Sequence, residues 1–192
     1  MEQKRKRRIG AIVGSDSDLK QCVPGIDFML NKHLYGNVEL AWFDTSSQHR
    51  NTLTLQGILT AYATLPEDQR VDVLIVGAGL ANHLSGCSDA FLRYTLRNDR
   101  IVVIAVAFEG KDQRETMAAV YSITYVPGTQ AVFKDYIGID GFLQACRDAL
   151  EMELPEIKLP AVKPWTRRTW LEAHVEGRRL LEIDEQKKLA AS

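Results

Sequence analysis

Short runs of apolar residues alternate along the chain with longer segments in which apolar positions recur every three or four residues. Uninterrupted runs are typical of buried parallel strands, whereas the longer spacing is typical of amphipathic helices. Four strands are expected at residues 9–13, 38–43, 71–76 and 101–108, and residues 131–133 could form a short fifth. Strands that alternate with helices predict an α/β fold, with a parallel sheet covered by helices on both faces.

The helical segments show one irregularity. Leu19, Val23, Ile26, Leu30 and Leu34 mark the first helix, and Pro24-Gly25 falls inside it. Because proline breaks a helix interior but suits a first turn, we expect this helix to kink or to restart at Pro24. Further helical patterns cover residues 55–62, 80–96, 117–123 and 139–153.

The composition changes beyond Glu153. Three prolines at positions 155, 160 and 164 space out an extended segment, and a charged helical stretch follows from Thr166 to Leu189. The apolar residues of this stretch form no continuous stripe, so it cannot build a core alone. We therefore expect a basic overhang at 1–8, an α/β domain at 9–153, and a linker with a C-terminal helical arm at 154–192. The arm either lies on a neighbouring subunit or is a solvated tail.

Composition and charge narrow the class of protein. The chain has 192 residues, of which 45% are hydrophobic and 26% charged, and its formal net charge is −1. These values favour a soluble globular protein with no membrane span and no general affinity for nucleic acid, and the cysteine usage fits a reducing cytoplasm. The basic run at 4–8 has no interleaved aromatic residue to stack on bases. Cys22, Cys87 and Cys146 are odd in number and widely spaced, so neither a disulfide framework nor a zinc site is indicated.

Polar residues follow each of the first three strands. The loops are Gly14-Ser-Asp-Ser-Asp18, residues 44–50 and Gly77-Ala-Gly79. Because ligands of parallel sheets bind beyond the carboxyl ends of the strands, we expect these loops to share one site. In the first loop, Ser15 and Ser17 and the start of the helix could hold a phosphate, and Asp18 suits ribose hydroxyls. An ordinary helix-capping turn explains this loop equally well.

His49 and Arg50 supply the candidate chemistry. An imidazole exchanges protons near neutrality, and a guanidinium binds phosphate through paired hydrogen bonds, so the two suit proton transfer beside a phosphate. His83 could face the same pocket, although packing or a supporting role is favoured. No HxxxH spacing indicates a metal site, and no basic neighbour marks Cys87 as a nucleophile.

Three motifs in order resemble the PurE family. GSDSD at 14–18, SQHR at 47–50 and GAGLANHLSG at 77–86 correspond to GSxSD, SAHR and GAGGAAHLPG in that family. The family comprises N5-carboxyaminoimidazole ribonucleotide mutase and aminoimidazole ribonucleotide carboxylase. The resemblance runs from about Ile9 to Leu150, and the stretch after Thr166 looks like the family's helical extension. It implies a flavodoxin-like three-layer fold, a homo-octamer, and carboxylate chemistry on a phosphoribosyl substrate in purine synthesis.

The resemblance also implies roles for individual residues. The catalytic histidine of the family falls on His49, which would shuttle the proton at imidazole C4 without a metal or an organic cofactor. The matching substrate-binding positions are Ser15, Ser17, Asp18, Ser47, Arg50, Gly77, Gly79 and His83.

Departures from the motifs keep an alternative open. Gln48 stands for Ala, Leu80 for the second Gly of a pair, Asn82 for Ala and Ser85 for Pro. Residues 106–110 replace the family's VPVQS, and residues 125–131 replace MPxGxPV. The resemblance is thus closer at the phosphoribosyl end of the pocket than at the imidazole end. A related protein that acts on, or only binds, a different phosphoribosyl compound is the alternative, and the motifs do not separate mutase from carboxylase.

Overall fold

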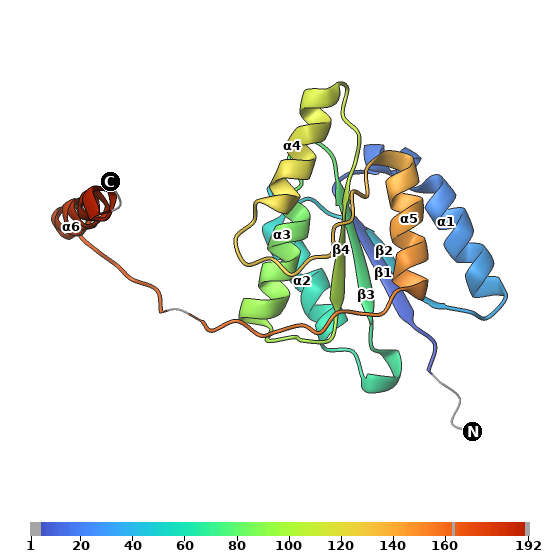
Figure 1. Cartoon of the computed structure of the whole chain (residues 1–192). Coiled ribbons are helices and arrows are strands. Elements are labelled where there is room, and N and C mark those ends of the chain that lie inside the picture. Colours follow the sequence, from blue (N-terminus) through green and yellow to red (C-terminus); the bar gives the residue numbers. More distant parts are fainter. Residues whose placement is uncertain (1–4, 163, 191–192) are drawn as a thin grey trace. The chain divides into compact units, whose positions relative to one another are not determined.

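Four parallel strands form the sheet at the centre of the fold, as Figure 1 lets the reader follow. They are β1 (Arg8–Val13), β2 (Glu39–Thr45), β3 (Val73–Ala78) and β4 (Val102–Ala107), in the order β2-β1-β3-β4. The apolar runs of β3 and β4 are buried along their whole length, as strands covered on both faces require. The four strands predicted from the apolar runs are therefore confirmed.

The structure is a computed structural model and describes residues 5–162 and 164–190. Its contacts divide the chain into two units, Met1–Pro160 and Ala161–Ser192. The first unit contains the sheet and extends beyond the boundary predicted after Glu153. Leu154 and Ile157 account for part of this extension, because both pack against the hydrophobic core.

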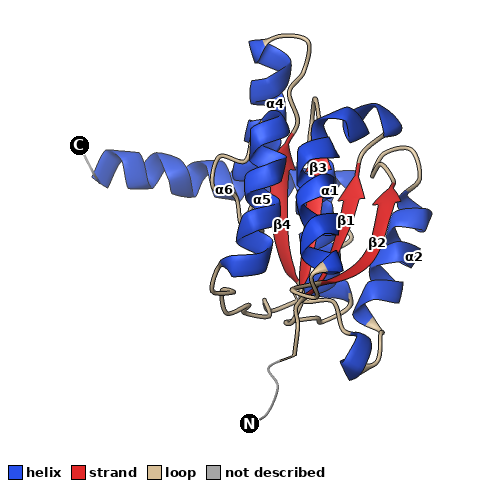
Figure 2. Cartoon of the chain, turned by 90° about the vertical axis from the view of Figure 1, so that its right-hand side faces the viewer, coloured by secondary structure: helices blue, strands red, loops and turns tan. Residues whose placement is uncertain are grey.

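Helices cover the sheet on both faces (Figures 1 and 2). On one face lie α1 (Leu19–Leu34) and α5 (Gly138–Glu151), and on the other lie α2 (Thr52–Ala63), α3 (His83–Ala90) and α4 (Gln113–Thr124). Met29 and Phe142 belong to the core under the first pair, and Leu59 and Leu84 to the core on the opposite face. The fold is therefore the predicted flavodoxin-like three-layer α/β/α arrangement.

Helix α1 differs from its prediction in two respects. It runs without interruption through Pro24, so the predicted restart at that residue is wrong. Its buried face carries Cys22, Gly25 and Met29. The exposed apolar residues of the predicted stripe are Val23, Leu30 and Leu34. Small residues decide the orientation, because a Cβ on Gly25 would lie 2.5 Å from the Phe142 ring of α5.

Two further elements are shorter than predicted. Residues 131–133 form no strand, and among the described residues two isolated bridges, Ile104 with Val132 and Ala107 with Ile137, extend the sheet beyond β4. The helix predicted over 80–96 begins at His83, and its last part is a π-helical turn over Phe91–Thr95.

The described part of the basic N-terminal run contacts the domain. Arg8 belongs to β1, and Arg5 forms an ion pair with Asp72. Arg7 donates hydrogen bonds to the carbonyls of Ala149 at 3.1 Å and Met152 at 2.6 Å. These carbonyls lie at the C-terminus of α5, where a cation also suits the helix dipole. Arg5, Arg7 and Arg8 thus tie this segment to the domain, although residues 5 and 6 remain exposed.

The second unit contains α6 (Trp170–Ala190). The helix begins later than the predicted Thr166 because Thr169 and Glu172 form a capping box. Glu172 accepts hydrogen bonds from the Thr169 N–H at 2.7 Å and hydroxyl at 2.9 Å, and the Thr169 hydroxyl accepts the Glu172 N–H at 3.2 Å. No residue of α6 is buried within this chain. Across the described ranges, no helix is long and apolar enough to cross a membrane.

Candidate active site

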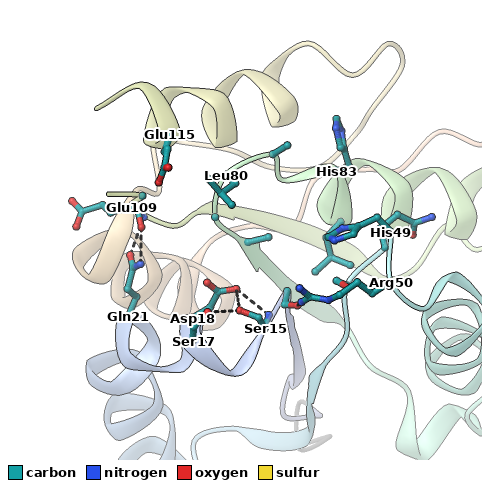
Figure 3. Close-up of a pocket in the computed structure, with 18 of the residues that line it drawn as sticks. Ser15, Ser17, Asp18, Gln21, His49, Arg50, Leu80, His83, Glu109 and Glu115 are labelled. Atoms are coloured by element: carbon teal, nitrogen blue, oxygen red, sulfur yellow. Dashed lines mark hydrogen bonds between the residues drawn. The ribbon is translucent and has the colours of Figure 1, made fainter. Parts of the chain in front are cut away.

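A pocket of about 700 Å³ opens at the carboxyl ends of the strands (Figure 3). Ser15, Ser17 and Asp18 reach it from the loop after β1. Ser47, His49 and Arg50 line it from the loop after β2, and Gly79 and His83 line it from the segment after β3. The sheet topology therefore brings together eight of the nine residues proposed from the sequence.

Gly77 is the exception. It is buried in β3 and does not line the pocket. A Cβ at this position would lie 2.6 Å from the Phe108 ring, so the strand needs a glycine for packing. Its carbonyl accepts the Gly14 N–H at 2.9 Å. Gly77 thus supports the first loop from a position outside the lining of the pocket.

The first loop gathers hydroxyl groups around one carboxylate. The Asp18 carboxylate accepts hydrogen bonds from the Ser15 N–H at 3.0 Å and the Ser15 hydroxyl at 3.3 Å. The hydroxyl oxygens of Ser15 and Ser17 lie 2.5 Å apart. Burial raises the pKa of Asp18, and the bonds from Ser15 and the charge of Arg50 oppose that rise. The loop therefore presents hydroxyl donors together with a half-buried acceptor.

Arg50 joins the second loop to the first. Its guanidinium donates a hydrogen bond to the Gly14 carbonyl at 2.9 Å, which engages one of its five N–H donors. Gly14 is required by close approach rather than by unusual dihedral angles, because a Cβ there would lie 3.0 Å from the Ala78 Cβ. The two loops thus form one continuous wall.

Ser47 and His49 complete the second loop. Ser47 is buried, and its hydroxyl has no hydrogen-bond partner among the residues that the structure describes. A buried hydroxyl without a partner costs free energy, so a ligand that pairs with it gains affinity. His49 is exposed on the same wall, where its imidazole is accessible from the pocket. This wall combines a proton carrier with an unpaired hydroxyl.

The third loop contains a strained residue. Leu80 has a φ of +57°, which lies in the left-handed region that favours glycine. Its side chain is 58% exposed and lines the pocket. The backbone here therefore adopts a conformation that suits glycine, while the side chain occupies space that a glycine would leave open.

Asn82 caps the helix that follows this loop. It is fully buried, and its side-chain oxygen accepts the Ser85 N–H at 3.1 Å. Its amide nitrogen donates to the Val106 carbonyl at 2.8 Å. The Ser85 hydroxyl donates to the Val76 carbonyl at 2.9 Å. These bonds fix the start of α3, and with it His83, relative to β3 and β4.

The loop after β4, together with α1 and α4, forms a further side of the pocket. Gln21 of α1, Glu109 and Lys111 of the loop after β4, and Glu115 of α4 also line the pocket. Figure 3 shows Gln21, Glu109 and Glu115 across the pocket from His49 and Arg50. The topology rule that located the first three loops applies equally to the loop after β4. The resemblance placed residues 106–110 at the imidazole end of the pocket, so Glu109 was expected there, whereas Gln21, Lys111 and Glu115 carry no motif and were missed.

A metal site and a cysteine nucleophile find less support in the structure. Within residues 5–162 and 164–190, no cluster of three or more His, Cys, Asp or Glu side chains could hold a metal ion. Burial raises the pKa of the Cys87 thiol, which lowers its thiolate content and its reactivity. His49 is thus the candidate for proton transfer at this pocket.

Comparison with known proteins gives the family. The family model described as AIR carboxylase matches residues 8–153, which include all the loops of the pocket. The crystal structure of Treponema denticola PurE has the same fold, with a TM-score of 0.52 and 16% sequence identity over 96% of this chain and 99% of that chain. No curated protein matches significantly. The family match covers most of the chain, and the chain therefore belongs to the AIR carboxylase family.

Proposed function

We propose that the protein transfers a carboxylate on aminoimidazole ribonucleotide in purine biosynthesis, as N5-carboxyaminoimidazole ribonucleotide mutase or as aminoimidazole ribonucleotide carboxylase. The observation that carries the proposal is the wall formed by Ser47, His49 and Arg50. It places a proton carrier beside a guanidinium and a buried unpaired hydroxyl. This set suits a phosphorylated substrate that must exchange a proton.

The phosphoribosyl half of the substrate would bind between the first two loops. Arg50 and the hydroxyls of Ser15, Ser17 and Ser47 can donate hydrogen bonds to phosphate oxygens. The Asp18 carboxylate repels phosphate and can accept hydrogen bonds from ribose hydroxyls instead. Arg50 already contacts the Gly14 carbonyl, so phosphate binding would require little rearrangement of the two loops.

His49 would carry the proton. Carboxylation forms a bond between C4 and carbon dioxide, and C4 must then release its proton, which a neutral imidazole accepts. In the mutase reaction, the N5 carboxylate leaves as carbon dioxide while the nitrogen takes up a proton from the protonated imidazole, and carbon dioxide then adds to C4, whose proton returns to the imidazole. The step needs an electron-rich imidazole ring and a proton carrier, so we propose that it proceeds without a cofactor. Exclusion of water would prevent loss of carbon dioxide from the pocket.

One observation favours a second candidate function. Leu80 projects into the pocket where the family motif has a glycine, and Glu109 stands where the family has glutamine. Neither change falls within the Ser15–Asp18 loop itself. A protein that acts on, or only binds, another phosphoribosyl compound would keep the phosphate-binding loops and alter these positions.

Turnover assays separate the two candidates. The purified protein is supplied with aminoimidazole ribonucleotide and bicarbonate, and separately with the N5-carboxy derivative. Turnover of the first alone indicates a carboxylase, and turnover of the second indicates a mutase. Saturable binding of aminoimidazole ribonucleotide without turnover of either compound would contradict the first function and support the second.

We also propose that the chain assembles as a homo-oligomer, an octamer if it follows the family. Support comes from apolar side chains that find no cover within their own unit of the chain. Trp42 of the edge strand β2 is 55% exposed, and Trp170 at the start of α6 is 95% exposed. Burial of such side chains in a second subunit would stabilise an assembly.

A further inference from the structure

Gln21 of α1 is bonded to the loop after β4 by both ends of its side-chain amide. Its nitrogen donates to the Glu109 carbonyl at 3.0 Å, and its oxygen accepts the Glu109 N–H at 2.9 Å (Figure 3). The side chain is buried, with 7% of the residue exposed. A planar amide that satisfies both polar groups of one residue fixes the position and the orientation of that peptide segment.

The sheet cannot supply these bonds. The last ladder pairing of β4 is at Ala107, and the Phe108 N–H is bonded to the Ala78 carbonyl at 3.0 Å. Glu109 lies beyond the end of β3, where no further strand residue faces it. Gln21 therefore takes the place of a neighbouring strand for one residue, and it does so where the chain turns from the sheet to the pocket.

The next two residues are held from the other side, by α4. The Gly110 N–H donates to the Thr116 hydroxyl at 3.0 Å, and the Lys111 N–H donates to the Glu115 carboxylate at 2.7 Å. The contact with α4 is close enough that a Cβ on Gly110 would lie 2.2 Å from the Glu115 Cβ. The segment 109–111 is thus fixed between α1 and α4.

The fixed part of Glu109 is its main chain. Its carboxylate lies over Gly138, since a Cβ there would meet the Glu109 Cδ at 2.7 Å. Figure 3 shows this carboxylate directed away from His49. The main chain of Glu109, which forms part of the wall opposite His49, therefore depends on Gln21 for its position.

We propose that Gln21 is a positioning residue that holds segment 109–111 as the wall against which the base of the substrate is oriented toward His49. The inference rests on the proposed function. The first two loops bind one end of the substrate, so the geometry at the other end depends on this wall. A displacement of about 1 Å at a reacting centre can lower a rate by about a hundredfold, so a wall held by two hydrogen bonds matters for the rate.

The test uses two substitutions of Gln21 and one matched control. Gln21→Met keeps the length of the side chain and removes both hydrogen bonds, and Gln21→Glu keeps the acceptor and loses the donor. The control is Asn98→Leu. Asn98 is also 7% exposed, and its side-chain oxygen accepts the N–H groups of Arg100 and Ile101 at 3.0 and 2.9 Å. It thus holds backbone at the opposite end of β4, away from the pocket.

Amide hydrogen exchange at Glu109 and steady-state kinetics are measured on the full chain. In Gln21→Met, exchange at Glu109 should accelerate at least tenfold, and kcat should fall about tenfold with less than a threefold change in KM. Gln21→Glu should give intermediate values for kcat. Asn98→Leu should leave kcat and KM unchanged, although it lowers thermal stability.

Three outcomes would overturn the proposal. They are unchanged exchange at Glu109 in Gln21→Met, faster exchange with unchanged kcat, and an equal loss of kcat in Asn98→Leu. If the wild-type protein turns over neither imidazole substrate, the proposed function fails. Exchange at Glu109 and the affinity for aminoimidazole ribonucleotide then still test whether Gln21 positions this wall.

Discussion

The side-chain oxygen of Asn82 accepts the backbone N–H of Ser85 at 3.1 Å and lies 3.0 Å from the Ser85 hydroxyl oxygen. Both residues depart from the PurE motif, which has alanine and proline at these positions. Proline has no N–H, so the motif needs no acceptor at position 82. A serine at position 85 does need one, and Asn82 supplies it. The two departures are therefore a single coupled exchange that preserves the start of α3.

This coupling can be measured. Asn82→Ala should lower the free energy of unfolding by about 1–3 kcal/mol, because the Ser85 N–H and the Val106 carbonyl lose their buried partner. The same change should cost less in a Ser85→Pro background, where the N–H no longer exists. Denaturant unfolding of the two single variants and the double variant gives the coupling free energy. Strictly additive effects would mean that the two departures are independent.

Replacing His49 tests the proton carrier. His49→Asn keeps hydrogen bonding but cannot shuttle a proton near neutrality, so kcat should fall about 10²- to 10⁴-fold while substrate affinity changes little. His33→Asn is the control. His33 does not line the pocket, and it contacts the Val38 carbonyl at the C-terminal end of α1. An unchanged rate in His49→Asn would remove this residue from the mechanism.

Arg50 is expected to recognise the phosphate. Arg50→Ala should weaken binding of the phosphorylated ligand by about 1.5–3 kcal/mol and change binding of the dephosphorylated form much less. Arg50→Lys keeps the positive charge but loses the paired hydrogen-bond geometry. Its affinity for the phosphorylated ligand should therefore lie between those of the wild type and Arg50→Ala. Isothermal titration with both ligands measures these differences. Equal losses for both ligands would show that Arg50 acts only through its bond to the Gly14 carbonyl.

Leu80 separates backbone strain from pocket volume. Leu80→Gly removes the backbone strain that the positive φ causes and also opens the pocket. Leu80→Ala opens the pocket but keeps a Cβ, and therefore keeps the strain. The glycine variant should be about 1 kcal/mol more stable than the alanine variant, as thermal unfolding can show. If Leu80 obstructs the family substrate, both variants should turn it over faster than the wild type. No gain in either variant would favour a different substrate.

The C-terminal arm is tested by a chain that ends at Pro160. This end keeps Lys158, whose N–H and carbonyl are bonded to the Gln130 side chain at 2.8 and 2.7 Å. The sheet and its helices should therefore remain folded by circular dichroism. If the arm binds a neighbouring subunit, light scattering should show a smaller assembly than the full chain forms. An unchanged assembly would show that other surfaces hold the oligomer together.

Local patterns predicted most of the scaffold. Buried parallel strands need long apolar runs, and the sheet topology then placed the loops containing Ser15, His49 and Gly79 at one edge. Helical periodicity was less reliable for α1, because it measures where apolar side chains recur. The buried face was selected instead by the space available beside Gly25 and by the approach of Phe142. Such close contacts depend on a partner far along the chain.

The part of the site that sequence reasoning missed also depends on contacts between residues that lie far apart along the chain. Gln21 and Glu109 meet only when α1 and the end of β4 are both in place, and Gln21 carries no motif. Leu80 shows the complementary case, since its sequence position suggested a changed pocket but not that the backbone keeps a glycine conformation. Side-chain identity alone does not report the dihedral angles imposed by the surrounding loop.

The packing of α1 against α5 has a consequence for biosynthesis. A ribosome releases β1 and α1 early, but the face of α1 that carries Cys22, Gly25 and Met29 is covered by a helix that begins only at Gly138. A nascent chain shorter than this leaves that face open to water and to chaperones. One whole layer of the domain therefore completes its folding only when synthesis of the α/β domain is nearly finished.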